Sequence, residues 1–317
     1  MSTELIIALI KASLVLGVLL TNTILLIWFE RKLVAGMQSR VGPDRAGPFG
    51  ILQTVADAIK LLLKEQIMPL KADRAMYLLA PILALVPSFL IFMIIPLGPD
   101  LNIEVGGKNY AIDFVGADLN VGVLYFLALS SIAVYSVVLA GWSSGSKYPL
   151  LGGVRASAQM ISYEAAMGLS LVPVILYSGS LSLVDIVSSQ SGNLSTSIPI
   201  LSSIVSFIPK WNIFPQFIAF GIFFIAAVAE VNRAPFDLVE AEQELVGGFH
   251  TEYSGFRFAM FFLAEYINMF NMCAITATFF LGGWLGPTFE NFLPPVLSAI
   301  MPIIWLGVKT FSLLFIF

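Results

Sequence analysis

The chain has 317 residues, of which 58% are hydrophobic and only 11% are charged, and its mean hydropathy is +0.91. Soluble domains carry about 25% charged residues, so this composition excludes soluble enzymes, disordered scaffolds and secreted disulfide proteins. A net charge of −4 argues against a nucleic-acid partner, and the single cysteine, Cys273, can form no internal disulfide. The composition indicates a polytopic membrane protein.

Long apolar stretches predict membrane-spanning helices, because the runs are too long for strands and lack two-residue alternation. The first stretch continues into Glu30-Arg31-Lys32 without a small-residue cleavage site, so we expect a span and not a removable signal peptide. The fold class predicted is an all-α polytopic membrane protein, with one transmembrane domain over 1–317. Its seven expected spans are 5–29, 75–97, 121–142, 157–177, 213–230, 256–285 and 293–317.

Lysine and arginine are distributed unevenly between the two sets of connecting segments. The segments 30–74, 143–156 and 231–255, with the start of the next span, hold twelve of them: Arg31, Lys32, Arg40, Arg45, Lys60, Lys64, Lys71, Arg74, Lys147, Arg155, Arg233 and Arg257. The opposite segments hold two, Lys108 and Lys210. Basic loops stay on the cytoplasmic side, so we expect these three loops to be cytoplasmic and the N-terminus to lie outside.

The first cytoplasmic connection contains an amphipathic pattern over 50–65. Apolar residues recur at helical spacing, and polar residues, among them Asp57 and Lys60, fall between them. Such a helix is suited to lying in the membrane interface or against a partner.

The connection 231–255 is strongly acidic. It holds Asp237, Glu240, Glu242, Glu244 and Glu252. Arg233 is its only lysine or arginine. Composition alone favours a solvated loop, and the aspartate or asparagine and glycine spacing of a calcium loop is missing. His250 has no second histidine or cysteine at ligand spacing, so no metal site is expected and we interpret it as non-catalytic.

Four ionisable residues fall inside the predicted spans: Glu164, Glu230, Glu265 and Lys309. Charged groups avoid lipid, so such residues usually face the bundle or a wet cavity and can exchange protons; the alternative is a packing role. Counting residues from the span ends places all four in the cytoplasmic half of the bilayer. A complete transporter needs polar groups through the full thickness, so this half-path predicts transfer of protons or charge to a partner.

Several long motifs resemble one family. They are Glu30-Arg31-Lys32, SRVGPDRAGPFGILQTVADAIKLLLKE (39–65), GSKYPLLGGVRASAQMISYE (145–164), AEVNRAPFDLVEAEQELVGGFHTEYSG (229–255) and FFLAEY (261–266). Together they are similar to the H-type subunit of bacterial respiratory complex I, the proton-pumping NADH:quinone oxidoreductase, and to its mitochondrial subunit 1 counterpart. Asp44 stands where the family often has asparagine. The family has eight spans, so the resemblance implies an arginine-rich loop and one further helix after Phe317.

The resemblance implies roles for specific residues, none of them a redox centre and none catalytic. The implied quinone-tunnel residues are Arg31, Arg40, Asp57, Ala58 and Phe236. The implied proton path contains Glu164, Glu230, Glu265 and Tyr266. The implied coupling loop, which would link quinone chemistry to pumping, contains Arg233, Asp237, Glu240, Glu242 and Glu244.

The resemblance also implies partners and a location. The chain would bind quinone as substrate but no covalently attached cofactor, with NADH, FMN and Fe-S clusters held by partner subunits. Other membrane and hydrophilic-arm subunits and membrane lipids would surround it in the bacterial inner membrane. The alternatives are the equivalent subunit of a membrane-bound hydrogenase or another relative not fed by NADH, an independent ion carrier, and a purely structural anchor.

Overall fold

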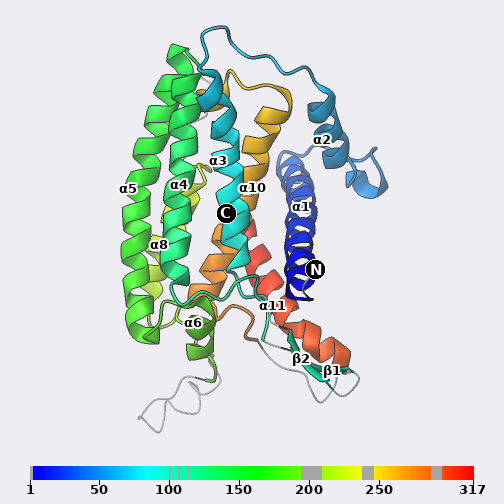
Figure 1. Ribbon diagram of the computed structural model, residues 1–317, viewed down its shortest axis with the longest axis vertical. Coiled ribbons are helices and arrows are strands. Elements are labelled where there is room, and N and C mark those ends of the chain that lie inside the picture. Colours follow the sequence, from blue (N-terminus) through cyan, green and yellow to red (C-terminus); the bar gives the residue numbers. More distant parts are fainter. Residues whose placement is uncertain are drawn as a thin grey trace. The chain divides into compact units, whose positions relative to one another are not determined.

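The computed structural model describes residues 3–99, 101–105, 108–112, 114–193, 209–237, 246–286 and 295–317 (Figure 1). Five described helices are long and apolar enough to cross a bilayer. They are α1 (Thr3–Met37, apolar from Lys11), α3 (Arg74–Met93), α4 (Gly122–Ser143), α5 (Lys147–Ser178) and α10 (Gly255–Phe280). Two further helices are apolar over shorter lengths, α8 (Phe217–Glu230) and the 300–316 part of α11 (Pro295–Ile316). A multi-pass helical membrane protein is therefore confirmed.

The helix that was predicted over 157–177 begins ten residues earlier, at Lys147. Most of the expected loop 143–156 is thus helical, and Ser144–Ser146 alone joins α4 to α5. The two helices approach closely, since a Cβ on Gly141 would lie 2.5 Å from the carbonyl oxygen of Pro149. Lys147 and Arg155 lower the hydropathy of this part without opposing a helix, so a hydropathy pattern places its start too late.

Some short elements were not predicted. Strands β1 (Leu101–Val105) and β2 (Lys108–Ile112) pair antiparallel, from Leu101 opposite Ile112 to Val105 opposite Lys108, so the all-α expectation was incomplete. The sequence signal was present, because a Gly-Gly pair between two short runs is typical of a tight hairpin. Helix α6 (Leu183–Ser189) begins at Ser182, whose hydroxyl caps the backbone N–H of Asp185.

The chain forms two compact units, each with its own core. The first comprises Met1–Leu90, Leu129–Ile161 and Ala234–Met269. In it, the small residues Ala80 of α3, Ala140 of α4 and Ala264 of α10 pack with Tyr77 and Tyr253. The core residues are Tyr77, Ala80, Ala84, Ala140, Tyr253, Phe261 and Ala264.

The second unit comprises Ile91–Ala128, Ser162–Arg233 and Phe270–Phe317. Its core is aromatic: the ring of Phe223 from α8 lies 6.0 Å from that of Phe279 and 5.6 Å from that of Phe280, both on α10. All three side chains are fully buried. Tilted and edge-on aromatic pairs at these distances stabilise packing beyond the burial of their area.

Candidate functional site

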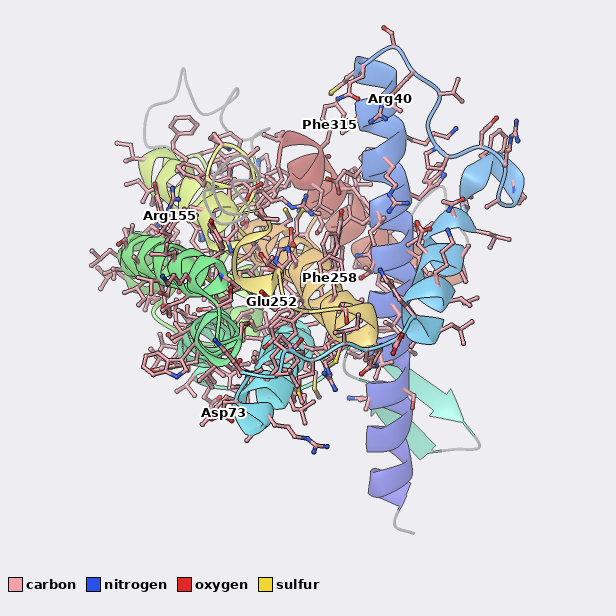
Figure 2. The ribbon with its side chains drawn as sticks, turned by 90° about the horizontal axis from the view of Figure 1, so that it is seen from above. Arg40, Asp73, Arg155, Glu252, Phe258 and Phe315 are labelled. Atoms are coloured by element: carbon pink, nitrogen blue, oxygen red, sulfur yellow. The ribbon has the colours of Figure 1, made fainter. Side chains whose placement is uncertain are left out.

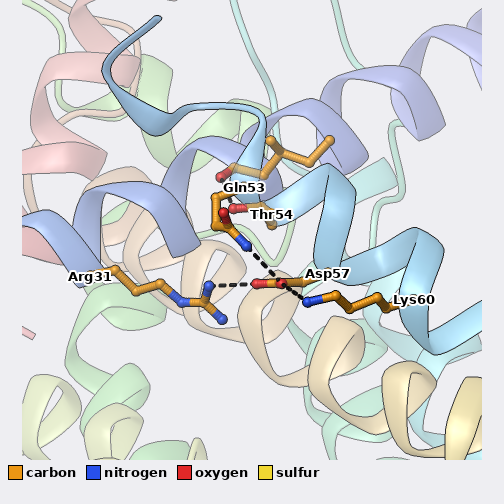
Figure 3. A network of polar contacts seen from close by, with 6 residues as sticks. Arg31, Gln53, Thr54, Asp57 and Lys60 are labelled. Atoms are coloured by element: carbon orange, nitrogen blue, oxygen red, sulfur yellow. Dashed lines mark hydrogen bonds and ion pairs between the residues drawn. The ribbon is translucent and has the colours of Figure 1, made fainter. Parts of the chain in front are cut away.

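An ion pair joins helix α1 to the amphipathic helix α2 (Gln53–Leu63), which follows the short helix η1 (Pro48–Gly50). Arg31 Nη1 lies 2.6 Å from Asp57 Oδ2, and Gln53 Nε2 donates to Asp57 Oδ1 at 3.0 Å (Figure 3). Trp28 fixes the start of this segment by donating from Nε1 to the carbonyl oxygen of Phe49 at 2.9 Å. The amphipathic helix predicted over 50–65 therefore lies beside the charged C-terminal part of α1.

The pKa of Asp57 reflects this pairing. Partial burial of its carboxyl would raise the pKa, but the hydrogen bonds from Arg31 and Gln53 and the positive charge of Arg31 outweigh burial. The resulting pKa lies below the usual 3.8, so Asp57 is ionised at neutral pH. Arg31 and Asp57, which were both predicted for the quinone tunnel, thus form an ion pair.

A cavity of about 450 Å³ opens next to this pair. Its walls come from α1, from the turn after α1 and from Tyr266 on α10. The lining residues are Glu30, Arg31, Val34, Ala35, Arg40, Val41, Gly42, Pro43 and Tyr266. Arg40 follows the end of the long α1 ribbon (Figure 2). The volume is within the range of small-molecule sites, and two guanidinium groups and one carboxyl group give the cavity fixed polar contacts.

Tyr266 links the cavity to the predicted proton path. Its hydroxyl donates to Glu30 Oε2 at 2.7 Å, and Glu265 precedes it on α10. Sequence reasoning assigned no role to Glu30, although it named this residue as part of the charged segment Glu30-Arg31-Lys32. Its place directly before Arg31 in the motif was the available signal.

Other predicted tunnel residues do not line this cavity. Ala58 is exposed on α2, and Phe236 is half-buried with its carbonyl oxygen accepting a hydrogen bond from Gln159 Nε2 of α5 at 2.8 Å. Of the predicted tunnel residues, Arg31 and Arg40 therefore line the cavity, and Asp57 is joined to it only through its ion pair with Arg31.

Two predicted path residues lie together in the second unit. Glu230 ends α8 with 6% of its surface exposed, and the charges of Glu164 and Glu230 are close enough to repel each other. Glu230 Oε2 has no hydrogen-bond partner among the described residues. Ionisable groups buried in a membrane-spanning bundle usually serve a function, so this pair is a candidate for the predicted proton path.

The predicted coupling loop is described only at its ends. Asp237 is exposed and Arg233 is half-buried, whereas Glu240, Glu242 and Glu244 lie outside the described residues. At the far end, the short helix η2 (Gly248–His250) carries His250. Burial lowers the pKa of His250 to about 4, so its ring is neutral at pH 7.

Lys309 does not share the depth of Glu265, and that expectation was wrong. Its ammonium donates to the carbonyl oxygens of Leu281 at 2.6 Å, Gly283 at 2.9 Å and Leu285, which follow the last residue of α10. Glu265 lies 15 residues before that last residue, Phe280, or roughly 22 Å along the helix. Counting residues along α11 fails because depth depends on where a helix meets its neighbours.

No group of three or more histidine, cysteine, aspartate or glutamate residues in the described part of the chain is arranged to hold a metal ion.

The sequence profile of one family, described as NADH dehydrogenase, matches residues 10–317. The chain belongs to this family. It is 48% identical to the second H-type NADH-quinone oxidoreductase subunit of Koribacter versatilis, over 99% of this chain and 86% of the relative. It is 49% identical to the H-type subunit of Frankia casuarinae, over 98% of this chain, and spans only 64% of that relative's length. The H-type subunit of Brevibacillus brevis is 48% identical over 95% of this chain and 79% of the relative. The resemblance inferred from the motifs is thereby confirmed.

Proposed function

We propose that the chain is the H-type membrane subunit of a proton-translocating NADH:quinone oxidoreductase in the bacterial inner membrane. In this function it forms the entrance for quinone, its substrate, and the first part of the proton path. NADH, FMN and Fe-S clusters belong to partner subunits, and other membrane and hydrophilic-arm subunits and lipids surround the chain. The names of its relatives support the enzyme.

One observation carries the proposal, the cavity beside α1. It combines Arg31 and Arg40, which the resemblance assigns to quinone, with Tyr266, which it assigns to proton transfer. Quinone reduction consumes protons, so a cavity that joins both kinds of residue is suited to coupling the two processes. The hydrogen bond from Tyr266 to Glu30 gives a direct connection between them. In this proposal Glu265, Glu164 and Glu230 continue the path toward the membrane partners.

The proposed arrangement in the membrane has seven spans, an outside N-terminus and a single transmembrane domain. Helix α2 lies in the cytoplasmic interface, and its exposed apolar side chains support this: Leu52, Ile59, Leu62 and Leu63 are each more than half exposed. Ala58 and Phe236 line parts of the quinone tunnel outside the cavity.

The decisive experiment narrows the cavity without removing a charge. Val34 lines it, and Val34→Phe should raise the apparent KM for quinone several-fold in membrane vesicles. Leu14→Phe is the matched control, because Leu14 lies on the same helix, is 58% exposed and does not line the cavity. NADH oxidation by ferricyanide bypasses this subunit and should stay unchanged in both variants. An unaltered KM in Val34→Phe would remove the cavity from the quinone route.

The coupling loop needs its own test. Replacing Glu240, Glu242 and Glu244 together by glutamine should impair quinone reduction while ferricyanide reduction persists. If the complex fails to assemble instead, the loop is a docking surface for a partner and not a coupling element.

A further inference from the structure

The acidic loop between α8 and α10 is held at both ends, and the residues that hold it belong to helices outside the loop. At its N-terminal end, the side chain of Gln159 on α5 donates from Nε2 to the carbonyl oxygen of Phe236 at 2.8 Å. Phe236 directly precedes Asp237, the first acidic residue of the loop. The amide of Gln159 therefore fixes the backbone where the acidic segment begins.

The C-terminal end of the loop touches the same helix. A Cβ atom added to Gly152 of α5 would lie 2.8 Å from the Cα and carbonyl carbon of Gly248 and 2.9 Å from the backbone nitrogen of Phe249. Real Cβ atoms essentially never approach backbone that closely. Glycine at this position is therefore what lets the loop backbone lie directly on α5.

Gly152 and Gln159 occupy one face of α5. They are seven residues apart, which is close to two full turns of an α-helix and about 10 Å of rise. The two ends of the acidic loop, Phe236 and Gly248, are thus held by one stripe of a single rigid helix. A shift of this stripe would move both ends of the loop together.

Further contacts hold the C-terminal end in place. The ring of Tyr253 stacks on that of Tyr77 of α3, with centroids 4.1 Å apart and planes 5° apart, and Tyr77 donates from its hydroxyl to the carbonyl oxygen of Glu252 at 2.8 Å. Tyr253 is 5% exposed, and burial raises the pKa of its hydroxyl to about 12, so it stays protonated. The hydroxyl of Ser254 accepts a hydrogen bond from the backbone N–H of Ile67 at 2.8 Å.

We propose that the face of α5 that carries Gly152 and Gln159 holds the two described ends of the acidic loop, at 236–237 and 248–249, and that Gly152 and Gln159 are positioning residues for those ends. The inference rests on the proposed function of the loop and adds to it the element that sets the loop's place. Neither Gly152 nor Gln159 lines the cavity beside α1, so displacing the loop ends should lower turnover and leave the affinity for quinone unchanged.

The test is a pair of alanine variants in the assembled complex. Gly152→Ala pushes a methyl group into the loop backbone. Gly168→Ala is the matched control on the same helix, because a Cβ there meets only Leu127 Cδ1 at an ordinary 3.9 Å. Both changes raise helix propensity equally. Gln159→Leu, which keeps the approximate size but removes the donor, is a second and milder variant for the case that Gly152→Ala does not assemble.

Two measurements are made on each purified complex. Hydrogen exchange of the backbone amides 246–254 should become about tenfold faster in Gly152→Ala and Gln159→Leu, as expected for the loss of one buried interaction, and stay unchanged in Gly168→Ala. The kcat for quinone reduction should fall several-fold in the first two variants with the KM for quinone unchanged. A purely structural role would lower the amount of complex and leave the kcat per complex intact.

Unchanged hydrogen exchange in the assembled Gly152→Ala and Gln159→Leu complexes would show that α5 does not hold the loop ends. Faster exchange with full kcat would overturn the positioning role. The proposed function is judged separately by the triple glutamine variant of Glu240, Glu242 and Glu244. If that triple variant loses turnover while Gly152→Ala and Gln159→Leu keep it, the loop functions in coupling but α5 does not position it.

Discussion

Tyr266 of α10 donates a hydrogen bond to Glu30 of α1, a residue 236 positions earlier in the chain, with 2.7 Å between the two oxygens. Tyr266 is buried and Glu30 half-buried, and both line the same cavity as Arg31 and Arg40. The pair therefore joins the end of the first span to the helix that carries Glu265. A charged acceptor makes this one of the stronger kinds of hydrogen bond.

The first prediction concerns this pair. Tyr266→Phe removes the donor and keeps the ring, so we expect quinone-linked turnover to fall by about tenfold, which corresponds to roughly 1.4 kcal/mol. Glu30→Gln should act on the same step, so the double variant should lose less than the sum of the two single losses. Tyr135→Phe is the control, because Tyr135 is 64% exposed on α4. Strictly additive losses in this cycle would show that the two residues act independently.

The second prediction uses the pH dependence of the Arg31–Asp57 pair. Because the folded pKa of Asp57 is lowered from 3.8, its contribution to holding α2 on α1 is full above about pH 4 and is lost as the pH falls through the lowered value. Hydrogen exchange of 53–63 in the complex should therefore rise below about pH 4 in the wild type. In Asp57→Asn this exchange should be faster at neutral pH and lack the acid step. An acid step that persists in Asp57→Asn would assign it to another group.

The third prediction concerns Ala58, which follows Asp57 on α2 and is exposed. If quinone passes this surface, Ala58→Gln should raise the apparent KM for quinone about fivefold, equivalent to roughly 1 kcal/mol of binding free energy. Leu63→Gln, at a residue 82% exposed near the end of the same helix, should have little effect. Unchanged kinetics with both long-tailed and short-tailed quinones would place the tunnel elsewhere.

Patterns along the chain predicted the helices well because hydropathy reports directly on burial in lipid. The pattern over 50–65 predicted α2 at Gln53–Leu63, and the spans near α3 and α4 were placed within a few residues. The start of α5 was missed because a helix continues through Lys147 and Arg155, where hydropathy falls. Backbone hydrogen bonding in a helix and hydropathy are separate properties, and a hydropathy pattern along the sequence reports only the second.

Contacts between distant segments could not be predicted in the same way. Nothing in the sequence near Glu30 points to Tyr266, and nothing near Gly152 points to Gly248, because each contact depends on how whole helices pack. The predicted depth of Lys309 was wrong for the same reason, since its contacts with the segment after α10 depend on helix packing. The resemblance to a family supplied the proposed site residues, and the hydrogen bond from Tyr266 to Glu30 adds a candidate that the motifs alone did not give.

The fourth prediction concerns Lys309. Its ammonium satisfies carbonyl oxygens beyond the end of α10 and lies 4.3 Å from the centroid of the Trp211 ring. Lys309→Met would leave these buried acceptors unpaired, at about 1–3 kcal/mol for each one that finds no other partner. We expect the complex to inactivate several degrees lower on heating, with the KM for quinone unchanged. Ser312→Ala on the same helix, at an exposed residue, is the control.

The last prediction concerns the membrane carboxylates Glu164 and Glu230. Glu164→Gln and Glu230→Gln keep the size of each side chain but remove the proton that it could carry. If the two residues form part of the path, each change should reduce quinone-linked turnover and proton pumping together, because the two processes are coupled. Assembly should survive, since a neutral amide is less costly to bury than a carboxylate.

Pumping and turnover are measured in the same vesicles, with ferricyanide reduction as the measure of intact complex. Glu65→Gln is the control, because Glu65 is exposed after α2 and belongs to no proposed path. Because both residues belong to the proposed path, one of them can retain part of the proton transfer when the other is replaced. The double variant should therefore lose more pumping than either single variant. Full pumping in the double variant would end the proton-path assignment and leave these residues as packing elements.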